Sequence, residues 1–247
     1  PLIASYFGLT GVFLFTGILG LISLPYVIFG IKEPSIVKHH EDAEFTSSYL
    51  SVVLKDKNLL KMDFGVFVLH MTLTAVFTAV PIIFAHQHSI DLKDIWKIYL
   101  LMFFVGLTIM VPSTIIAEKK GKIKQVKMLG ILILIISFIM FILFKDNFYL
   151  TVLAIVVYFT GFMMLEPIMP SLMSKYAKPH VKGTASGVFN TAQFIGAFVG
   201  GAVGGLLLKI DDSAKLNFIF LTVLTLVWLV LVSSMEMPVK GVKNDTN

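Results

Sequence analysis

Two titratable side chains stand inside otherwise apolar segments of this 247-residue sequence. Glu166 is the only acidic or basic residue from Phe148 to Leu172, and Pro167 and Pro170 follow it closely. His70 stands alone in the same way inside an earlier apolar segment. A carboxyl group and an imidazole can both bind and release protons near neutral pH when their surroundings favour it. The chemistry that these residue types indicate is proton exchange.

The position of Glu166 is expensive if its segment crosses a membrane. An acidic residue near the middle of such a helix costs on the order of 2.5–3.5 kcal/mol, unless it faces water or a partner. Because desolvation disfavours the charged form, we expect Glu166 to exchange protons near neutral pH. Pro167 and Pro170 free backbone carbonyls and bend the helix, which suits the lining of a cavity. A structural carboxylate, hydrogen-bonded between helices, is the alternative.

His70 and Glu166 are predicted to lie at similar depth. His70 lies about seven residues, or roughly 10 Å, into the stretch FGVFVLHMTLTAVF. Glu166 lies about the same distance from the matching end of its own segment. His70 is either a proton relay or a packed, hydrogen-bonded residue. Thr74 follows one turn later on the same face and is expected to help line the site.

The segments that hold these residues have the length of membrane spans. The sequence is 57% hydrophobic, and 14% of its residues are charged, against about 25% in soluble domains. Crossing a hydrocarbon core takes roughly 17–25 residues. Seven runs come near that length, at 6–31, 64–84, 98–117, 128–144, 148–172, 184–208 and 216–235. We therefore predict an all-α integral membrane protein.

The basic residues indicate how the spans are oriented. All 20 are lysines, and alternate loops divide them fifteen to five. This positive-inside bias makes the 32–58 loop, the 118–127 loop, the 173–183 loop and the C-terminus cytoplasmic. Basicity here reports topology, so no nucleic-acid partner is expected. Without cysteine there is no disulfide or thiol chemistry, and no signal peptide is expected at the N-terminus.

Four regions follow along the chain. They are 1–31, which contains the first span; 32–58, a cytoplasmic linker; 59–236, six closely connected spans; and 237–247, a short cytoplasmic tail. Within the linker, Phe45, Tyr49, Val52 and Val53 recur at helical spacing. This spacing is typical of an amphipathic helix at the membrane interface, and a solvated linker is the alternative.

The span 184–208 is rich in glycine. Its glycines recur at the four-residue spacing that lets membrane helices approach closely. We expect them to serve helix packing and sliding: Gly196, Gly200, Gly201, Gly204 and Gly205. Asn190 and Gln193, in the cytoplasmic third of this span, are candidate cavity residues or polar contacts between helices. The pattern and its surroundings do not fit a nucleotide-binding fingerprint.

The remaining composition bears on the substrate. There is no arginine, and the runs listed above contain no lysine, so no clamp for phosphate or carboxylate is expected. Aromatic and methionine side chains are plentiful within the spans: Phe77, Tyr158, Phe159, Phe162, Met163 and Met164. This lining favours a hydrophobic solute, including a cationic one. No metal or other cofactor and no catalytic residue is expected, and the pair of His86 and His88 is interpreted as part of a surface loop.

The stretch TIIAEKKGKIK, residues 114–124, resembles the cytoplasmic loop signature of the major facilitator superfamily. Glu118 stands for the acidic residue of that signature and Lys119 for its first basic residue. Gly121 and Lys122 fill the following places, whereas Thr114 replaces the leading glycine. The stretch from Leu165 to Gly205 and the HMTLTAVF stretch are similar to bacterial drug/proton antiporters of this superfamily.

The resemblance implies the general-substrate-transporter fold, present here as the C-terminal six-helix half plus one preceding helix. Residues 1–31 would be the end of helix 5 and helix 6, and Pro1 would be the last residue of an antiporter Gly-Pro motif. Helices 7 and 10 line the central cavity in this superfamily, which fits His70 and Glu166. Helix 11 packs between the halves, which fits the glycine-rich span. The implied partners are a small-molecule substrate, protons, the lipid bilayer and the N-terminal half.

The expected function is proton-coupled alternating access, most readily drug efflux across a bacterial inner membrane. Glu166 would be protonated and released in turn, His70 would tune or relay the proton, and the loop from Glu118 to Lys122 would act as a latch. An uptake symporter for a sugar, peptide or metabolite is an alternative with the same fold. A non-transporting membrane sensor or scaffold is an alternative of another class.

Overall fold

The computed structural model describes residues 2–31 and 47–235, which are mostly helical and contain no strand. Nine α-helices and two short 3₁₀ turns make up this described part. The helices are α1 (Leu2–Gly30), α2 (Ser47–Lys55), α3 (Lys57–His88), α4 (Ile95–Lys119), α5 (Ile123–Phe144), α6 (Phe148–Leu165), α7 (Ile168–Tyr176), α8 (Lys182–Ile210) and α9 (Lys215–Ser233). The 3₁₀ turns are η2 (Leu92–Asp94) and η3 (Pro179–Val181). The predicted all-α class is confirmed.

Seven helical segments are long and apolar enough to cross a membrane. They correspond one to one with the seven runs predicted from the sequence, and α6 and α7 together form one of them. Several helices extend beyond their apolar runs. The side chain of Asp56 accepts hydrogen bonds from the backbone N–H groups of Asn58 and Leu59, which starts α3 before its apolar part begins. The predicted tail 237–247 and most of the linker lie outside the described residues.

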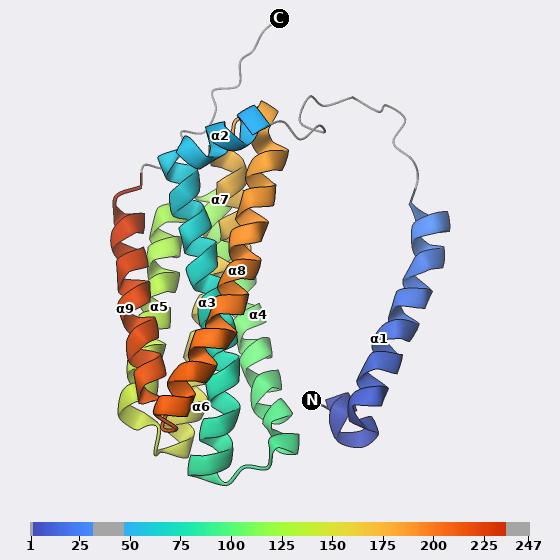
Figure 1. Ribbon diagram of the computed structural model, residues 1–247, viewed down its shortest axis with the longest axis vertical. Helices are drawn as coiled ribbons and strands as arrows, with labels where there is room; N and C mark the ends of the chain where they lie inside the picture. Colours follow the sequence, from blue (N-terminus) through green and yellow to red (C-terminus); the bar gives the residue numbers. More distant parts are fainter. Residues whose placement is uncertain (1, 32–46, 236–247) are drawn as a thin grey trace, which may run out of the picture.

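Helices α3 to α9 form one bundle, with α1 standing apart from it (Figure 1). Within the bundle α3 packs closely along α8, while α5 lies between α6 and α9, and α6 lies against α4. Helix α1 has a break at Gly8 (φ 65°, ψ −170°), and most of its large apolar side chains are exposed. Large apolar side chains also cover the outside of the bundle, as expected for surfaces in contact with lipid.

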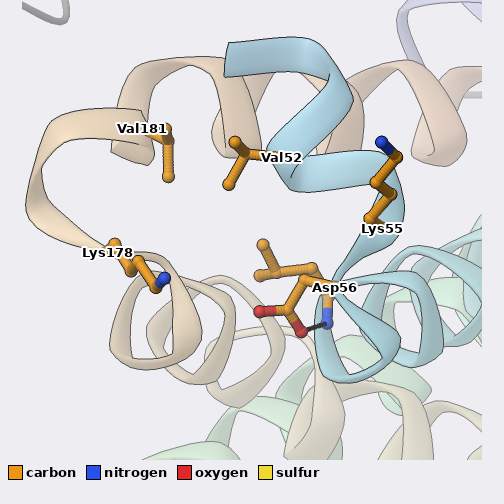
Figure 2. A pocket seen from close by; sticks show the side chains of 6 residues that line it. Val52, Lys55, Asp56, Lys178 and Val181 are labelled. Carbon is orange, nitrogen blue, oxygen red and sulfur yellow. Dashed lines mark hydrogen bonds between the residues drawn. The ribbon is translucent and has the colours of Figure 1, made fainter. Parts of the chain in front are cut away.

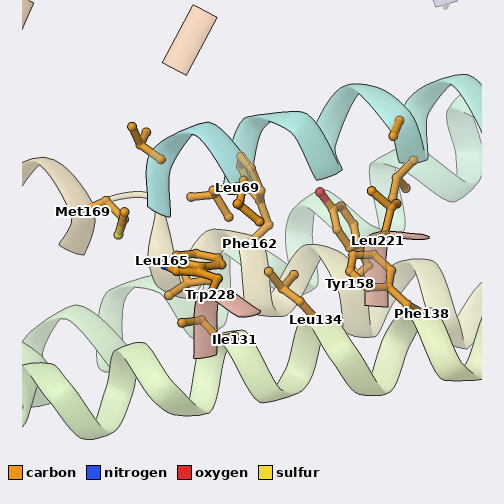
Figure 3. Packing of buried hydrophobic residues seen from close by; sticks show 14 of the residues in the cluster. Leu69, Ile131, Leu134, Phe138, Tyr158, Phe162, Leu165, Met169, Leu221 and Trp228 are labelled. Atoms are coloured by element: carbon orange, nitrogen blue, oxygen red, sulfur yellow. The ribbon is translucent and has the colours of Figure 1, made fainter. Parts of the chain in front are cut away.

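The bundle core is filled by aromatic and branched side chains (Figure 3). The rings of Phe141 and Phe218 stack with centroids 4.4 Å apart, and Trp228 is fully buried. The hydroxyl groups of Thr72 and Tyr158 lie 3.1 Å apart, so the buried phenol has a partner. In lipid such packing stabilises the bundle through dispersion contacts and satisfied polar groups rather than through removal of water.

Helix α2 packs against one end of this bundle, on α3 and α8. Val53 is fully buried, and the ring of Tyr49 meets that of His180 edge to face at 6.2 Å. Beside it a cavity of about 310 Å³ is lined by Val52, Lys55, Asp56, Leu59, Lys178 and Val181. Figure 2 shows Asp56 and Lys178 on opposite sides of this space. We call this end of the bundle the lysine-rich end.

Candidate functional site

Glu166 lies at a break between two helices that together form one span. Helix α6 ends at Leu165 and α7 begins at Ile168. Pro167 has no N–H group to bond the carbonyl of Met163, and Pro170 leaves the carbonyl of Glu166 without a helical partner. The backbone N–H of Glu166 still donates to the Phe162 carbonyl at 3.0 Å. The predicted bend therefore occurs at the carboxylate itself.

His70 faces this break from α3. Its Nε2 atom lies 3.7 Å from Oε2 of Glu166, and its Nδ1 atom lies 3.2 Å from the Val66 carbonyl oxygen, which can only accept. The ring packs edge to face on Phe162, with centroids 5.9 Å apart. The His70 side chain is 10% exposed. The two titratable residues that were predicted to lie at similar depth are thus within reach of each other.

Helix α8 contributes the third polar partner. The side-chain Nε2 of Gln193 lies 2.9 Å from Nε2 of His70. Asn190 stands one turn before it and lines the same space. A cavity of about 70 Å³ is enclosed by these side chains: Val66, His70, Glu166, Met169, Pro170, Phe189, Asn190 and Gln193. Its walls combine four polar groups with four apolar residues.

Access to the cavity is provided at Glu166. Its side chain is 41% exposed, whereas the His70 side chain beside it is nearly covered. An ionised carboxylate is tolerated in a membrane protein when it meets water and a polar partner. In this chain Glu166 is 41% exposed and has His70 as a polar neighbour. The pair therefore combines a covered imidazole with an exposed carboxylate.

Thr74 is not among the residues that line this cavity. Its hydroxyl group donates to the Ala197 carbonyl on α8 at 2.7 Å. Thr74 lies where α3 and α8 pack closely, opposite Gly200, so its hydroxyl group is used in the contact between these helices. In this structure Thr74 contributes to the contact between α3 and α8.

The glycines of α8 fall into two groups. A Cβ atom on Gly196 or Gly200 would collide with the backbone of Phe67 or Met71 on α3, and one on Gly204 would come within 3.2 Å of Ala75. Nothing in the described chain lies within 4 Å of a Cβ on Gly201 or Gly205. One face of α8 is therefore packed tightly along α3, and the other is open.

The predicted loop signature links α4 to α7. Glu118 accepts a hydrogen bond from Ser171 Oγ at 2.6 Å and pairs with the Lys175 ammonium. Gly121 turns the chain with φ of 69°, a left-handed conformation that glycine adopts without strain. Lys119 ends α4, and Lys120 and Lys122 flank the turn. Glu118 therefore joins α4 to α7, and Lys124 at the end of the signature joins α5 to the end of α9 by donating to the Ser233 carbonyl.

Most of the aromatic and methionine residues that suggested the lining have another role. Tyr158, Phe159, Phe162 and Met164 are buried among the bundle helices. Figure 3 shows Tyr158 and Phe162 between α3 and α5, and the ring of Phe159 meets that of Phe103 on α4. None of the four lines the cavity, where Met169 and Phe189 provide the apolar wall. The apolar character that was expected for the site is present, but other side chains supply it.

Lys127 corrects the expectation that no lysine lies inside a span. Because α5 begins at Ile123, Lys127 stands one turn inside the helix and is fully buried. Its ammonium group lies 3.1 Å from the sulfur of Met62 and 3.8 Å from that of Met235. The signal that could have found it is its four-residue spacing from the partly buried Ile123 and the fully buried Ile131.

Asp63 is a second buried charge that the hydropathy pattern placed at a helix flank. It is 7% exposed, and its Oδ2 atom has no hydrogen-bond partner in the described chain. It lies seven residues, or about 10.5 Å, before His70 along α3. Among the described residues, no group of three His, Cys, Asp or Glu side chains is placed to hold a metal ion.

A bundle of membrane-length helices with a His–Glu contact at a broken helix is typical of a secondary transporter. The profile of the Major Facilitator Superfamily matches residues 1–201. The chain belongs to this superfamily, as its loop signature suggested, and is therefore part of a transporter rather than an enzyme.

Three curated relatives are similar to the chain along most of its length. It is 30% identical over 238 residues to the inner membrane transport protein YajR of Escherichia coli (strain K12), covering 96% of this chain and 52% of that protein. Two uncharacterized transporters of Buchnera aphidicola follow. The one from subsp. Baizongia pistaciae is 24% identical over 241 residues, covering 93% of this chain and 59% of its own length. The one from subsp. Acyrthosiphon pisum is 25% identical over 202 residues, covering 81% and 51%.

The chain thus spans about half the length of the curated relatives it matches. Its seven apolar spans and this relationship make it a multi-pass protein of the bacterial inner membrane.

Proposed function

We propose that this chain is the C-terminal half of a proton-coupled transporter that exports small hydrophobic solutes by alternating access. Its partner would be an N-terminal half of similar size, because the chain spans 52% of its relative YajR. We call a protein that contains both halves the intact transporter. The observation that carries the proposal is the contact of Glu166 with His70 at 3.7 Å, at a helix break, with the carboxylate 41% exposed.

The proton chemistry follows from this contact. An ionised Glu166 attracts either a proton or a cationic solute, and a protonated Glu166 attracts neither. Proton and solute therefore compete for one carboxylate, which is the linkage that exchange transport needs. His70 holds the proton near the carboxylate, because its Nε2 atom faces Oε2 of Glu166.

The character of the solute follows from the cavity wall. No lysine lines the cavity, and the sequence contains no arginine, so an anionic group would meet no cation there other than a protonated His70. Met169 and Phe189 offer an apolar surface beside the carboxylate. A hydrophobic solute, neutral or cationic, fits these groups best.

The bridge between α4 and α7 supports a role in the conformational change. Glu118 holds Ser171 and Lys175 in α7, which directly follows the break at Glu166. A movement at the break would therefore be felt at this bridge. We propose that the bridge is a latch that holds one of the two transport states.

Flux measurements with the intact transporter in proteoliposomes test the proposal, with tetraphenylphosphonium as the probe. A pH gradient should drive export of the probe, and Glu166→Gln should abolish export at unchanged expression. Asp212→Asn, an exposed carboxylate far from the site in sequence, is the control. Export by Glu166→Gln at the wild-type rate would remove the proposal.

The same measurement separates the alternatives. Inward flux of a solute driven by the pH gradient would indicate an uptake symporter instead of an exporter. A sensor or scaffold would show no flux, and it would tolerate alanine at both Glu166 and His70.

A further inference from the structure

The two ring nitrogens of His70 have different hydrogen-bond partners, and these partners decide which nitrogen keeps its hydrogen. Nδ1 lies 3.2 Å from the Val66 carbonyl oxygen, one turn earlier on α3. A carbonyl oxygen only accepts, so Nδ1 carries a hydrogen whether the ring is neutral or charged. The nitrogen that gains or loses a proton is therefore Nε2.

Nε2 faces two partners from different parts of the bundle. Gln193 on α8 places its amide nitrogen 2.9 Å away, and Glu166 at the end of α6 places Oε2 3.7 Å away. An amide nitrogen only donates, whereas an ionised carboxylate only accepts. The two partners therefore suit opposite protonation states of the ring.

Without the extra proton, Nε2 has a lone pair and accepts from the amide N–H of Gln193. With it, a hydrogen lies between Nε2 and the carboxyl oxygen, whichever of the two groups carries it. The amide N–H then faces a nitrogen that can no longer accept, and must turn away. Binding of one proton thus changes the partner of His70 Nε2 from Gln193 on α8 to Glu166 at the break between α6 and α7.

We infer that Gln193 is a positioning residue that stabilises the deprotonated state of His70 and links its proton to helix α8. The inference rests on the proposed proton coupling and adds a residue that favours the deprotonated form of His70. Gln193 acts through His70, so its removal leaves the proton site in place and changes its occupancy at a given pH.

Few other charges face this group. From α3 the nearest is Asp63, two turns toward the lysine-rich end, and from α6 it is Glu166 itself. Helix α8 offers the uncharged Asn190, and α7 offers Met169 and Pro170. Within the described chain, the proton on His70 is therefore governed mainly by Glu166 and Gln193.

The packing decides which side moves when the partner changes. Helix α8 is fixed along α3 by the close approach of Gly196 and Gly200 and by the hydrogen bond from Thr74 to Ala197. The α6–α7 break lacks two backbone hydrogen bonds because of its prolines. Protonation should therefore draw Glu166 toward His70, while only the side chain of Gln193 turns on α8.

The test compares the pH profiles of tetraphenylphosphonium export by the intact transporter and its variants. Gln193→Met keeps the length of the side chain and removes the donor. Its profile midpoint should move to higher pH by about 0.5–1 unit, a three- to tenfold gain in proton affinity, because one hydrogen bond to the deprotonated ring is lost. Gln193→Glu should shift it further in the same direction. Thr191→Val, two residues away on an exposed face of α8, should leave the midpoint unchanged.

The possible outcomes are distinct. An unchanged midpoint in both Gln193 variants, at normal or uniformly reduced rate, would mean that Gln193 has only a packing role. The inference would then fail, while the proposed function would stand. If the wild type shows no pH dependence and Glu166→Gln exports normally, the proposed function fails and takes the inference with it.

Discussion

His70 Nε2 lies 3.7 Å from Glu166 Oε2, and the two residues come from helices that are far apart in the sequence. An imidazole that is 10% exposed thereby meets a carboxylate that is 41% exposed. The covered group can hold a proton, and the open group can exchange it with the surroundings. In the proposed mechanism the exposed carboxylate is therefore the group through which the proton reaches the imidazole.

The packing of α8 on α3 predicts different effects for neighbouring glycines. Gly200→Ala should lower stability by roughly 1–3 kcal/mol, because its Cβ would overlap the Met71 carbonyl and the Thr74 hydroxyl. Gly201→Ala should leave stability unchanged or slightly raised, because nothing lies within 4 Å of its Cβ. Melting temperatures of the chain in detergent would test this, and equal values for the two variants would contradict the packing described.

Two lysines of α5 should respond in opposite ways to the same substitution. Lys127→Met should preserve or raise stability, because within the described residues the buried ammonium has only the sulfurs of Met62 and Met235 as partners. Lys124→Met should lower it by about 0.5–1.5 kcal/mol, because Lys124 donates to the carbonyls of Ser233 and Met235. A marked loss of stability in Lys127→Met would show that this lysine has a partner that the account lacks.

The bridge at the lysine-rich end should affect transport more than stability. Glu118 and Lys175 are about one third exposed, so Glu118→Gln should cost less than about 1 kcal/mol. If the bridge is a latch, the variant should still change the export rate of the intact transporter. Lys120→Gln, beside the turn, serves as the control. Wild-type export by Glu118→Gln would argue against a latch.

Asp211 should not contribute to pH dependence in the physiological range. Hydrogen bonds from Ser213 and from the backbone of Leu216 lower the pKa of its carboxyl group below the usual 3.8. A lowered pKa gives stability that is present above the unfolded value and lost as pH falls through the folded one. Asp211→Ala should therefore lower the melting temperature by the same amount at pH 5 and pH 8. A difference between the two would mean that Asp211 titrates higher; Asp212→Ala is the control.

Much of the fold could be predicted because hydropathy reports it directly. The spans follow from the lengths of the apolar runs, and the break at Glu166 follows from Pro167. The depth of His70 could be counted along its helix. Each of these properties depends on residues close together in the sequence.

What could not be predicted depends on contacts between distant segments. Gln193 is a polar residue in a glycine-rich helix, and nothing near it in the sequence indicates that it reaches His70 rather than another helix. Thr74 has the right spacing to face the cavity, yet its hydroxyl group donates a hydrogen bond to a backbone carbonyl of α8. Lys127 was assigned to a loop because hydropathy ends a span at the first charge, whereas the backbone continues the helix through it.

The central claim is that proton and solute share Glu166, and proton release on binding tests it most directly. Tetraphenylphosphonium would be added to the intact transporter in weakly buffered detergent solution, and the pH change recorded. The wild type should release protons on binding, and Glu166→Gln should bind the probe without releasing any. Equal proton release from both proteins would contradict the account.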